Sequence, residues 1–291
     1  MFSILIPTFN NIEYLKLCLR SIKKNSYFNH QIICHVNIGE DGTIEYLKKE
    51  NIEHTYTKYN SGVCEGINKA SKLSKFKYLL YGHDDFYYCP NWDLELVNQV
   101  KDIKNNNFYL SGTMINNGQI NFNCGSDINN FDEKKLLENY LDHNIHDFQG
   151  STWAPTLIHK DIWEKVSGFS EEFFPGAGSD PDFCMKLWKQ GIRIFKGINN
   201  CKVYHFGSIS LRKKKKKLTN YGSLSGKIFL LKWGISIKFF RKFYLKSNSN
   251  YDGPLKNPIK NLKYFSSLLV CKINYIYLKW FYKKIDNNFK T

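Results

Sequence analysis

The chain has 291 residues and a mass of 34.3 kDa, which is long enough for one large domain or for a domain with an appendage. Hydrophobic residues make up 42% and charged residues 23%, a balance that predicts a packed core and excludes a disordered chain. The formal net charge is +16, but it is unevenly spread. Residues 1–205 carry 22 Lys and Arg against 24 Asp and Glu, whereas residues 206–291 carry 20 against 2. A uniformly basic nucleic-acid-binding protein is therefore excluded, and we expect no nucleic-acid partner.

The cysteine pattern and the N-terminal sequence indicate the cellular compartment in which the protein is expected. None of the eight cysteines forms a C-x-x-C pair, so a zinc or redox motif is unsupported and buried thiols are expected. The first residues, 1–6, enter a strand-like run directly, with neither a basic region nor a small-residue cleavage site. We therefore expect a cytoplasmic protein, which its basic tail could bring to the inner membrane face.

The first eighty residues alternate between strand-like and helix-like segments. Helices are predicted to begin near residues 11, 44 and 62, and strands are predicted at 3–7, 31–38, 52–57 and 78–82. Asn10, with Glu13 three residues later, predicts a capping box for the first helix. This alternation predicts an α/β domain with a mostly parallel central sheet.

The fourth strand ends in a polar cluster. Residues 78–82 are mostly apolar and run directly into His83, Asp84 and Asp85. Ligands bind at the carboxyl ends of strands in open α/β sheets, and paired carboxylates suit Mg²⁺ or Mn²⁺. Taken alone, a solvated turn is the simpler explanation, because Asp is common after strands.

The rest of the first two hundred residues is less regular. Residues 116–130 are polar and loop-like, and the remaining pattern predicts helices at 92–101, 161–166 and 182–190 and strands at 108–114, 193–195 and 201–205.

Beyond residue 207 the composition changes. Arg212 to Lys217 are six consecutive cations, for which a solvated loop is the simplest structure and closure over a bound diphosphate the functional alternative. Residues 259–280 place apolar side chains on one helical face, namely Leu262, Phe265, Leu269, Ile273, Ile276 and Trp280. A cationic amphipathic helix of this kind is typical of an anionic membrane surface. Packing on the domain or on a partner subunit explains it equally well.

Seven short stretches together resemble the inverting nucleotide-sugar glycosyltransferases of family 2. They occur in the family's order within residues 3–207 and are residues 3–10, 40–43, 60–62, 83–85, 168–171, 180–187 and 204–205. The resemblance implies an α/β, Rossmann-like A-type glycosyltransferase fold, with residues 1–207 as the catalytic domain. Residues 208–291 would be a basic loop and an amphipathic helical region, which the resemblance does not cover.

The resemblance also implies a donor site. Pro7 and Thr8 would line the nucleoside base and Asp41 would accept a hydrogen bond from it, although an Asx turn with Gly42 also explains Asp41. Asp85 would bind Mn²⁺ or Mg²⁺, and Asp84 would bind the ribose or a metal-bound water. His83 stands where many family members have the first carboxylate of Asp-x-Asp.

Two further residues would complete this site. By resemblance, Asp180 is the catalytic base, while Asp182 competes for that role but fits helix N-terminal stabilisation better. His205 follows the last strand and would be a metal ligand, with a structural histidine equally plausible.

The expected function is thus a metal-dependent inverting glycosyltransferase that moves a sugar from a nucleoside-diphosphate donor to a hydroxyl of a polysaccharide or lipid-linked glycan. A nucleotidyltransferase is the first alternative, but residues 7–11 lack the glycine-rich phosphate loop that it would need. A non-catalytic membrane- or nucleic-acid-binding protein is the second, and it leaves the ordered acidic motifs unexplained.

Overall fold

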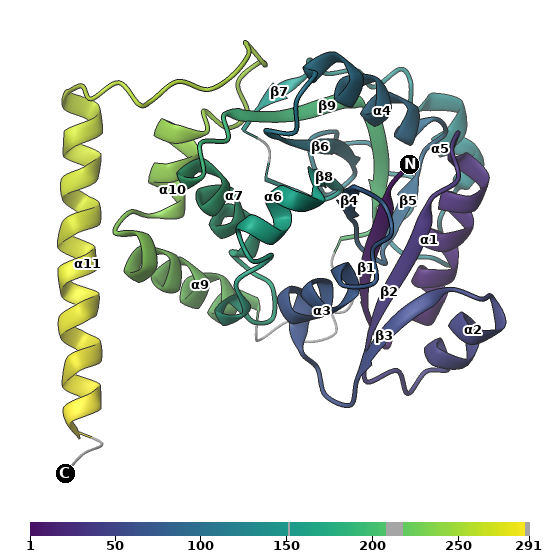
Figure 1. Ribbon diagram of the computed structural model, residues 1–291, viewed down its shortest axis with the longest axis horizontal. Coiled ribbons are helices and arrows are strands. Elements are labelled where there is room, and N and C mark those ends of the chain that lie inside the picture. Colours follow the sequence, from purple (N-terminus) through teal and green to yellow (C-terminus); the bar gives the residue numbers. More distant parts are fainter. Residues whose placement is uncertain (151, 208–217, 289–291) are drawn as a thin grey trace.

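The computed structural model of the protein describes residues 1–150, 152–207 and 218–288, except for the side chains of 218–223 and 281–288. One mixed sheet forms its centre (Figure 1). The strand order is β3-β2-β1-β4-β8-β6-β9-β5, with β7 paired to β9. The strands are β1 Ser3–Phe9, β2 Gln31–Asn37, β3 Glu53–Thr57, β4 Tyr78–Tyr81, β5 Phe86–Tyr88, β6 Phe108–Ile115, β7 Phe148–Gln149, β8 Thr156–His159 and β9 Ile194–His205.

The first half of the sheet is parallel. β1 pairs with β2 and β4, and β2 pairs with β3, all in parallel, which confirms the expected α/β architecture. Buried strands of this kind need apolar side chains on both faces, and residues 2–7 are all buried. β8, β5 and β7 then add antiparallel pairs on the other side of β4.

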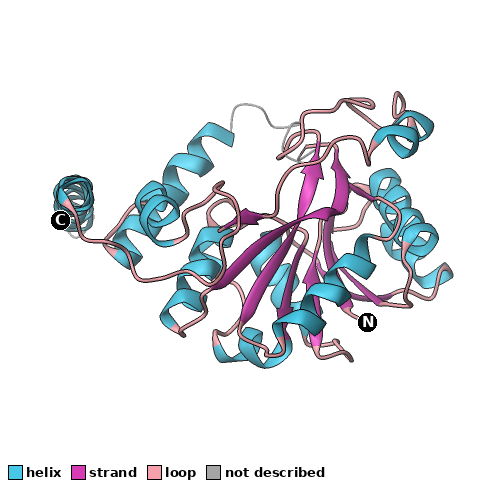
Figure 2. Ribbon diagram, turned by 90° about the horizontal axis from the view of Figure 1, so that it is seen from above, coloured by secondary structure: helices cyan, strands magenta, loops and turns pink. Residues whose placement is uncertain are grey.

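Helices cover both sides of the sheet (Figure 2). They are α1 Ile12–Asn25, α2 Thr43–Lys49, α3 Gly62–Ser71, α4 Trp92–Ile103, α5 Glu133–Asn139, α6 Lys160–Lys165, α7 Ser179–Lys189, α9 Leu218–Trp233, α10 Ile237–Phe239 and α11 Leu262–Asn288. A 3₁₀ turn, η1, spans Glu171–Phe173, and α10 continues as a π-helical turn, Phe240–Tyr244.

The C-terminal segment shares the core of the sheet domain. Phe229, Phe240, Leu245 and Leu255 are buried in the same hydrophobic cluster as the strands. The division that we predict at residue 207 thus coincides with a change in charge, while the elements on its two sides pack together.

α11 stands at one edge of the molecule (Figure 1). It packs on the rest through the buried Tyr264 and Cys271 and through the partly buried Leu268, Tyr275 and Leu278. Its predicted apolar face is mostly uncovered, because Leu262, Phe265, Leu269, Ile273, Ile276 and Trp280 are each more than half exposed. Among the helices that the structure describes, none has the combined length and apolar character that crossing a bilayer requires.

Some local predictions are wrong. The capping box at Asn10 is not formed, because Asn11 is the N-cap and the Asp41 carboxylate accepts from the Ile12 amide instead. The two predicted late strands are one strand, β9. The sequence pattern also missed α5 and β8, which lie in the irregular stretch between β6 and α6.

Candidate active site

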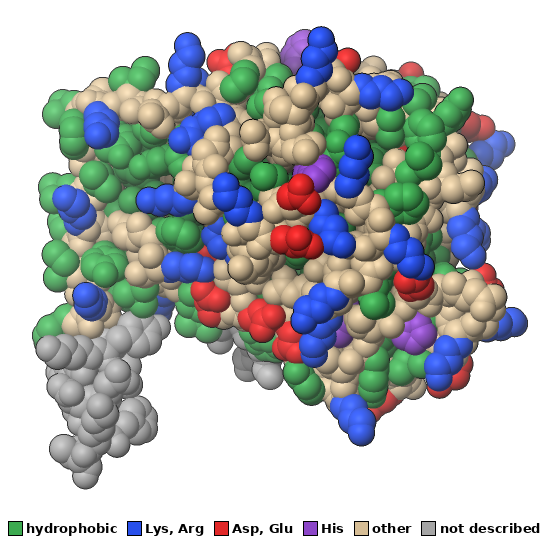
Figure 3. All heavy atoms as spheres, in the orientation of Figure 1, with side chains coloured by type: hydrophobic (Ala, Val, Ile, Leu, Met, Phe, Trp, Pro, Cys, Tyr) green, Lys and Arg blue, Asp and Glu red, His purple; other side chains and the backbone are tan. Residues whose placement is uncertain are grey.

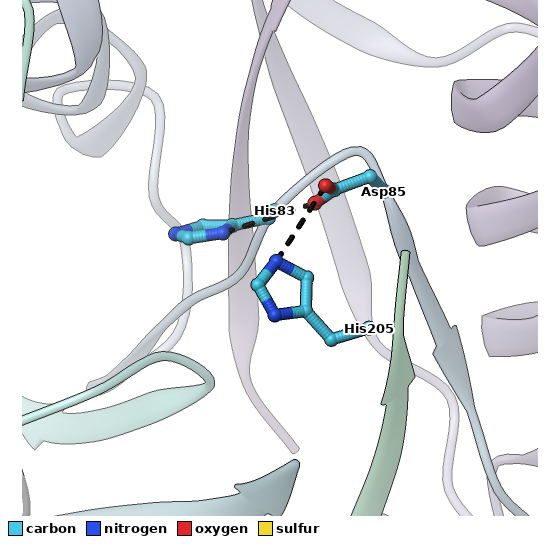
Figure 4. A group of neighbouring side chains, drawn as sticks. All are labelled: His83, Asp85 and His205. Carbon is cyan, nitrogen blue, oxygen red and sulfur yellow. Dashed lines mark ion pairs between the residues drawn. The ribbon is translucent and has the colours of Figure 1, made fainter. Parts of the chain in front are cut away.

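Three side chains that could hold a metal ion lie together where strands of the sheet end (Figure 4). They are His83 from the loop after β4, Asp85 just before β5 and His205 at the end of β9. One ligand atom from each lies within 4.8 Å of the others. The His205 Nε2 atom is 3.5 Å from Asp85 Oδ2, and the His83 Nδ1 atom is 3.8 Å from Asp85 Oδ1.

The register of the sheet brings these distant residues together. β5 and β9 are antiparallel, and Phe86 is the pairing partner of His205. The Phe206 amide also donates to the Asp85 carbonyl at 3.2 Å. The Phe86 ring, which is buried, stacks on His83 and meets His205 edge-on, so both imidazoles rest on one aromatic wall.

The chemistry of this donor set fits a divalent cation. The His205 Nε2 atom is buried and has no hydrogen-bond partner among the described residues, which is costly unless a ligand satisfies it. Burial lowers the pKa of His83 to about 4, so its imidazole is neutral at physiological pH, the form that binds metal. The Tyr81 hydroxyl lies 2.8 Å from the other ring nitrogen, Nε2, and fixes the orientation of this imidazole.

Asp84 lies near the end of β1, where the side chains of Thr8 and Asn11 are its neighbours. Burial and the neighbouring Asp85 raise its pKa to about 7, while the side chains of Thr8 and Asn11 lower it. The Thr8 hydroxyl oxygen, the Asn11 amide nitrogen and Asp84 Oδ2 are buried without hydrogen-bond partners among the described residues. These three buried polar groups are neighbours, and a hydroxyl-rich ligand that reached them would satisfy them. Pro7 is buried within β1, paired with His35.

Asp41 has a structural task. Its Oδ2 atom accepts from the Ile12 amide at 2.8 Å, and its Oδ1 atom accepts from the Thr43 hydroxyl at 2.6 Å. It therefore joins the starts of α1 and α2 at the same end of the sheet as Thr8. The local-turn explanation of Asp41 is thereby supported, and the residue remains partly exposed.

Asp180 occupies the first turn of α7 and is half-buried. Burial raises the pKa of its carboxyl to about 7, and its Oδ1 atom has no hydrogen-bond partner among the described residues. α7 begins at Gly178, whose φ of +81° suits glycine and whose missing side chain leaves room for Ser225 of α9. A carboxylate with this pKa and an oxygen that makes no hydrogen bond within the described residues is suited to accept a proton near neutral pH.

Tyr81 lies near both the candidate metal cluster and the Asp180 carboxylate. Its hydroxyl contacts His83, and its pKa is raised well above the ordinary value by burial first and then by the charges of Asp180 and Asp85. Both carboxylates thus lie within electrostatic reach of one phenol at the end of β4. Asp85 lies just after β4 and Asp180 lies in the first turn of α7, so the fold brings carboxylates from two distant segments near Tyr81.

Both carboxylate oxygens of Asp182 have partners within the protein. It is completely buried and accepts hydrogen bonds from the Ser170 hydroxyl at 2.6 Å and the Trp233 indole at 2.7 Å, and it pairs with Lys232 at 3.0 Å. It attaches α9 to α7, so no oxygen is left for proton transfer. Asp182 is therefore a poorer candidate than Asp180 for the catalytic base.

Two site residues were not predicted from sequence. His83 was noticed only as a replacement for a carboxylate, yet imidazole is itself a common metal ligand, and that substitution was the available signal. Tyr81 carried no signal, because an aromatic residue at a strand end usually belongs to the core. The cationic stretch Arg212–Lys217 lies outside the described residues.

Comparisons with known proteins agree with this geometry. Residues 3–157 match the family model described as glycosyl transferase family 2. A curated relative, an uncharacterized glycosyltransferase of Rickettsia bellii, is 29% identical over 118 residues, which are 38% of this chain. The matched region spans only 16% of that relative's length.

Solved structures share the fold. The crystal structure of S. aureus TarS superposes with a TM-score of 0.54 at 15% identity, covering 79% of this chain and 39% of that chain. The 1–349 fragment of TarS has been solved with UDP (TM-score 0.53, 14% identity) and with UDP-GlcNAc (0.52, 13%). These two matches cover 79% of this chain and 69% and 70% of the TarS chains. At such identities the likeness establishes the fold alone.

Proposed function

The chain belongs to glycosyl transferase family 2, and from this premise we propose that it transfers a sugar from a nucleoside-diphosphate donor to a hydroxyl group, with inversion at the anomeric carbon. The observation that carries the proposal is the placement of two different chemistries around Tyr81. Its hydroxyl contacts His83 of the cluster that could hold a cation, and the Asp180 carboxylate, whose pKa is raised, lies within its electrostatic reach. The complexes of TarS with UDP and UDP-GlcNAc support a uridine diphosphate sugar as the donor.

In this reaction His83, Asp85 and His205 would hold a Mn²⁺ or Mg²⁺ ion, which would supply positive charge to stabilise the leaving diphosphate. Thr8 and Asp84 supply the unsatisfied polar groups that bind the ribose, and Pro7 and Asp41 border the base. Asp180 removes the acceptor proton.

The proposed reaction forms one bond, breaks one bond and transfers one proton to Asp180. The acceptor oxygen forms a bond to the anomeric carbon while the bond from that carbon to the diphosphate oxygen breaks, and the electron pair departs with the nucleoside diphosphate. The proton of the acceptor hydroxyl passes to the Asp180 carboxylate. Attack from the face opposite the leaving group inverts the anomeric centre.

A ligand screen tests the donor assignment. With Mn²⁺ present, UDP at one hundred times its dissociation constant should stabilise the protein by about 2.7 kcal/mol, which raises Tm by several degrees. ADP, CDP and GDP at the same concentration are the matched controls. A protein whose Tm responds to none of the four diphosphates, with Mn²⁺ or with Mg²⁺, would contradict the proposed function.

We also propose that α11 attaches the protein to an anionic membrane surface, which would suit a polysaccharide or lipid-linked acceptor. Figure 3 shows hydrophobic side chains with Lys or Arg between them on the side of the molecule where α11 stands. α11, residues 262–288, contains five lysines against a single Asp, so the helix complements negative lipids in charge as well as in apolar area.

Substitutions on α11 should distinguish the contributions of its apolar and polar faces to membrane binding. Ile273→Glu puts a charge into the exposed apolar row and should reduce cosedimentation with phosphatidylglycerol vesicles at least fivefold. Asn274→Glu makes the same charge change at an exposed polar neighbour and should have a much smaller effect. Equal losses for the two variants would show that charge alone determines vesicle binding, and would contradict the proposal that the apolar face enters the membrane.

A further inference from the structure

A cavity of about 720 Å³ lies beside the candidate active site, and none of the site residues discussed above lines it. Its size is within the range of about 300–1,000 Å³ that is usual for ligand pockets. Its walls come from the turn after β6, the segment around β7, and the stretch from Arg241 to Asn250. The side chains that matter for its chemistry are Asn117, Gln119, His146, Trp153, Arg241 and Asn248.

The lining has the composition of a carbohydrate site. Trp153 is 43% exposed, although a ring of this size is usually covered, and it offers a flat apolar surface to the C–H face of a sugar. Asn117, Gln119 and Asn248 supply amide donors and acceptors for hydroxyl groups. None of the described lining residues is acidic.

Arg241 adds a charge preference. Its guanidinium lies over the Trp153 ring, 5.5 Å from the ring centre, and no Asp or Glu of the described residues forms an ion pair with it. An arginine held against an aromatic ring in this way presents its remaining donors to a carboxylate or a phosphate.

The cavity wall is firmly built. The Gln149 amide donates to the Ser249 carbonyl at 2.7 Å, and the Ser247 hydroxyl donates to the Gly150 carbonyl at 2.9 Å. These bonds fasten the segment after the π-helical turn to β7, so the C-terminal part of the chain completes a cavity that the sheet alone would leave open.

The cavity borders the strand end that carries His205, one of the three candidate metal ligands. On its rim, the Asn117 side chain donates to the carbonyl of His205 at 3.1 Å. A molecule in the cavity therefore lies next to the part of the site that could hold the cation.

We infer that this cavity binds the acceptor, and that the acceptor is a glycan that carries a carboxylate or phosphate group near the sugar that is glycosylated. The sugar lies on Trp153, and its anionic group binds Arg241. This inference rests on the proposed function, since it names the acceptor side of the same reaction.

Saturation-transfer NMR on the full chain tests it with two probes, a hyaluronan tetrasaccharide as the acidic glycan and chitotetraose as the neutral one. We expect the wild-type protein to bind the acidic probe at least fivefold more tightly. Trp153→Ala should weaken both probes at least fivefold, whereas Arg241→Gln should weaken only the acidic one. Tyr27→Ala and Lys238→Gln, which change an exposed aromatic and an exposed cation elsewhere, should leave both unchanged.

A parallel UDP titration with Mn²⁺ separates the two claims. If UDP binds all variants normally but the acidic probe fails to bind the wild type, or binds Trp153→Ala and Arg241→Gln like the wild type, the acceptor assignment is wrong and the donor assignment stands. If UDP does not bind while the acidic probe binds and both variants weaken it, the cavity is a glycan site and the proposed transferase function fails.

Discussion

Replacement of Asp180 by Asn is expected to abolish sugar transfer while leaving donor binding intact. General-base catalysis contributes about 10²–10⁴-fold, so kcat should fall by at least two orders of magnitude. Because the pKa of Asp180 is raised to about 7, kcat/KM of the wild type should rise with pH through that region as the carboxylate forms. UDP affinity, measured by calorimetry in the presence of Mn²⁺, should change less than threefold.

The same substitution should stabilise the protein. An unfolded Asp180 ionises near its ordinary pKa of 3.8, whereas the folded one ionises only near 7, so ionisation at pH 8 opposes folding by up to about 4 kcal/mol. The stabilising contribution of this group is complete below its unfolded pKa and is lost as the pH rises through its folded pKa. Asp180→Asn should therefore raise Tm by several degrees at pH 8, and the gain should vanish toward pH 4.

Asp182 provides the matched control, two residues along the same helix. Asp182→Asn leaves the Lys232 charge without this partner and weakens the bond from Trp233, so it should lower stability by about 3 kcal/mol. We expect one Asp→Asn change to raise Tm and remove turnover and the other to lower Tm. Turnover above a tenth of the wild-type value in Asp180→Asn would exclude Asp180 as the base.

Removal of a metal ligand should have the second large effect. Asp85→Asn and His205→Ala each take a donor from a three-residue site, so the Mn²⁺-dependent rise in Tm with UDP should disappear and turnover should fall at least a hundredfold. The measurement is a thermal-shift titration of Mn²⁺ at fixed UDP, paired with product release.

His54→Ala is the control for histidine removal, since His54 lies on the edge strand β3, at the other side of the sheet from β9. It should respond to Mn²⁺ and UDP like the wild type. If the Asp85→Asn and His205→Ala variants also keep the full response, the cluster does not bind the cation on which the donor depends.

The fold could be predicted from sequence where the hydrophobic pattern is regular. Ser3–Phe9, Gln31–Asn37 and Glu53–Thr57 are short β-rich runs separated by amphipathic helices, and a parallel sheet follows from that alternation. β8 was missed because Thr156–His159 is only four residues long and follows an irregular stretch. Its antiparallel pairing with β4 depends on tertiary contacts that no local pattern encodes.

The site residues were predicted to the extent that the resemblance names them, but their mutual arrangement was not. Phe86 pairs with His205, which lies 119 positions later in the sequence, and only the folded sheet reveals that Asp85 and His205 are neighbours. The neutral state of His83 likewise follows from its burial, which its sequence neighbours do not determine. The cavity beside Trp153 needs the C-terminal segment, for which the sequence offered no motif.

The central claim is that His83, Asp85 and His205 hold the divalent cation that binds the donor diphosphate. Its most direct test is an anomalous difference map, recorded at the manganese absorption edge, from crystals grown with Mn²⁺ and UDP. A single strong peak among these three side chains, with the UDP phosphates beside it, is the predicted result. Bound UDP with manganese elsewhere, or with no manganese at all, would contradict the account.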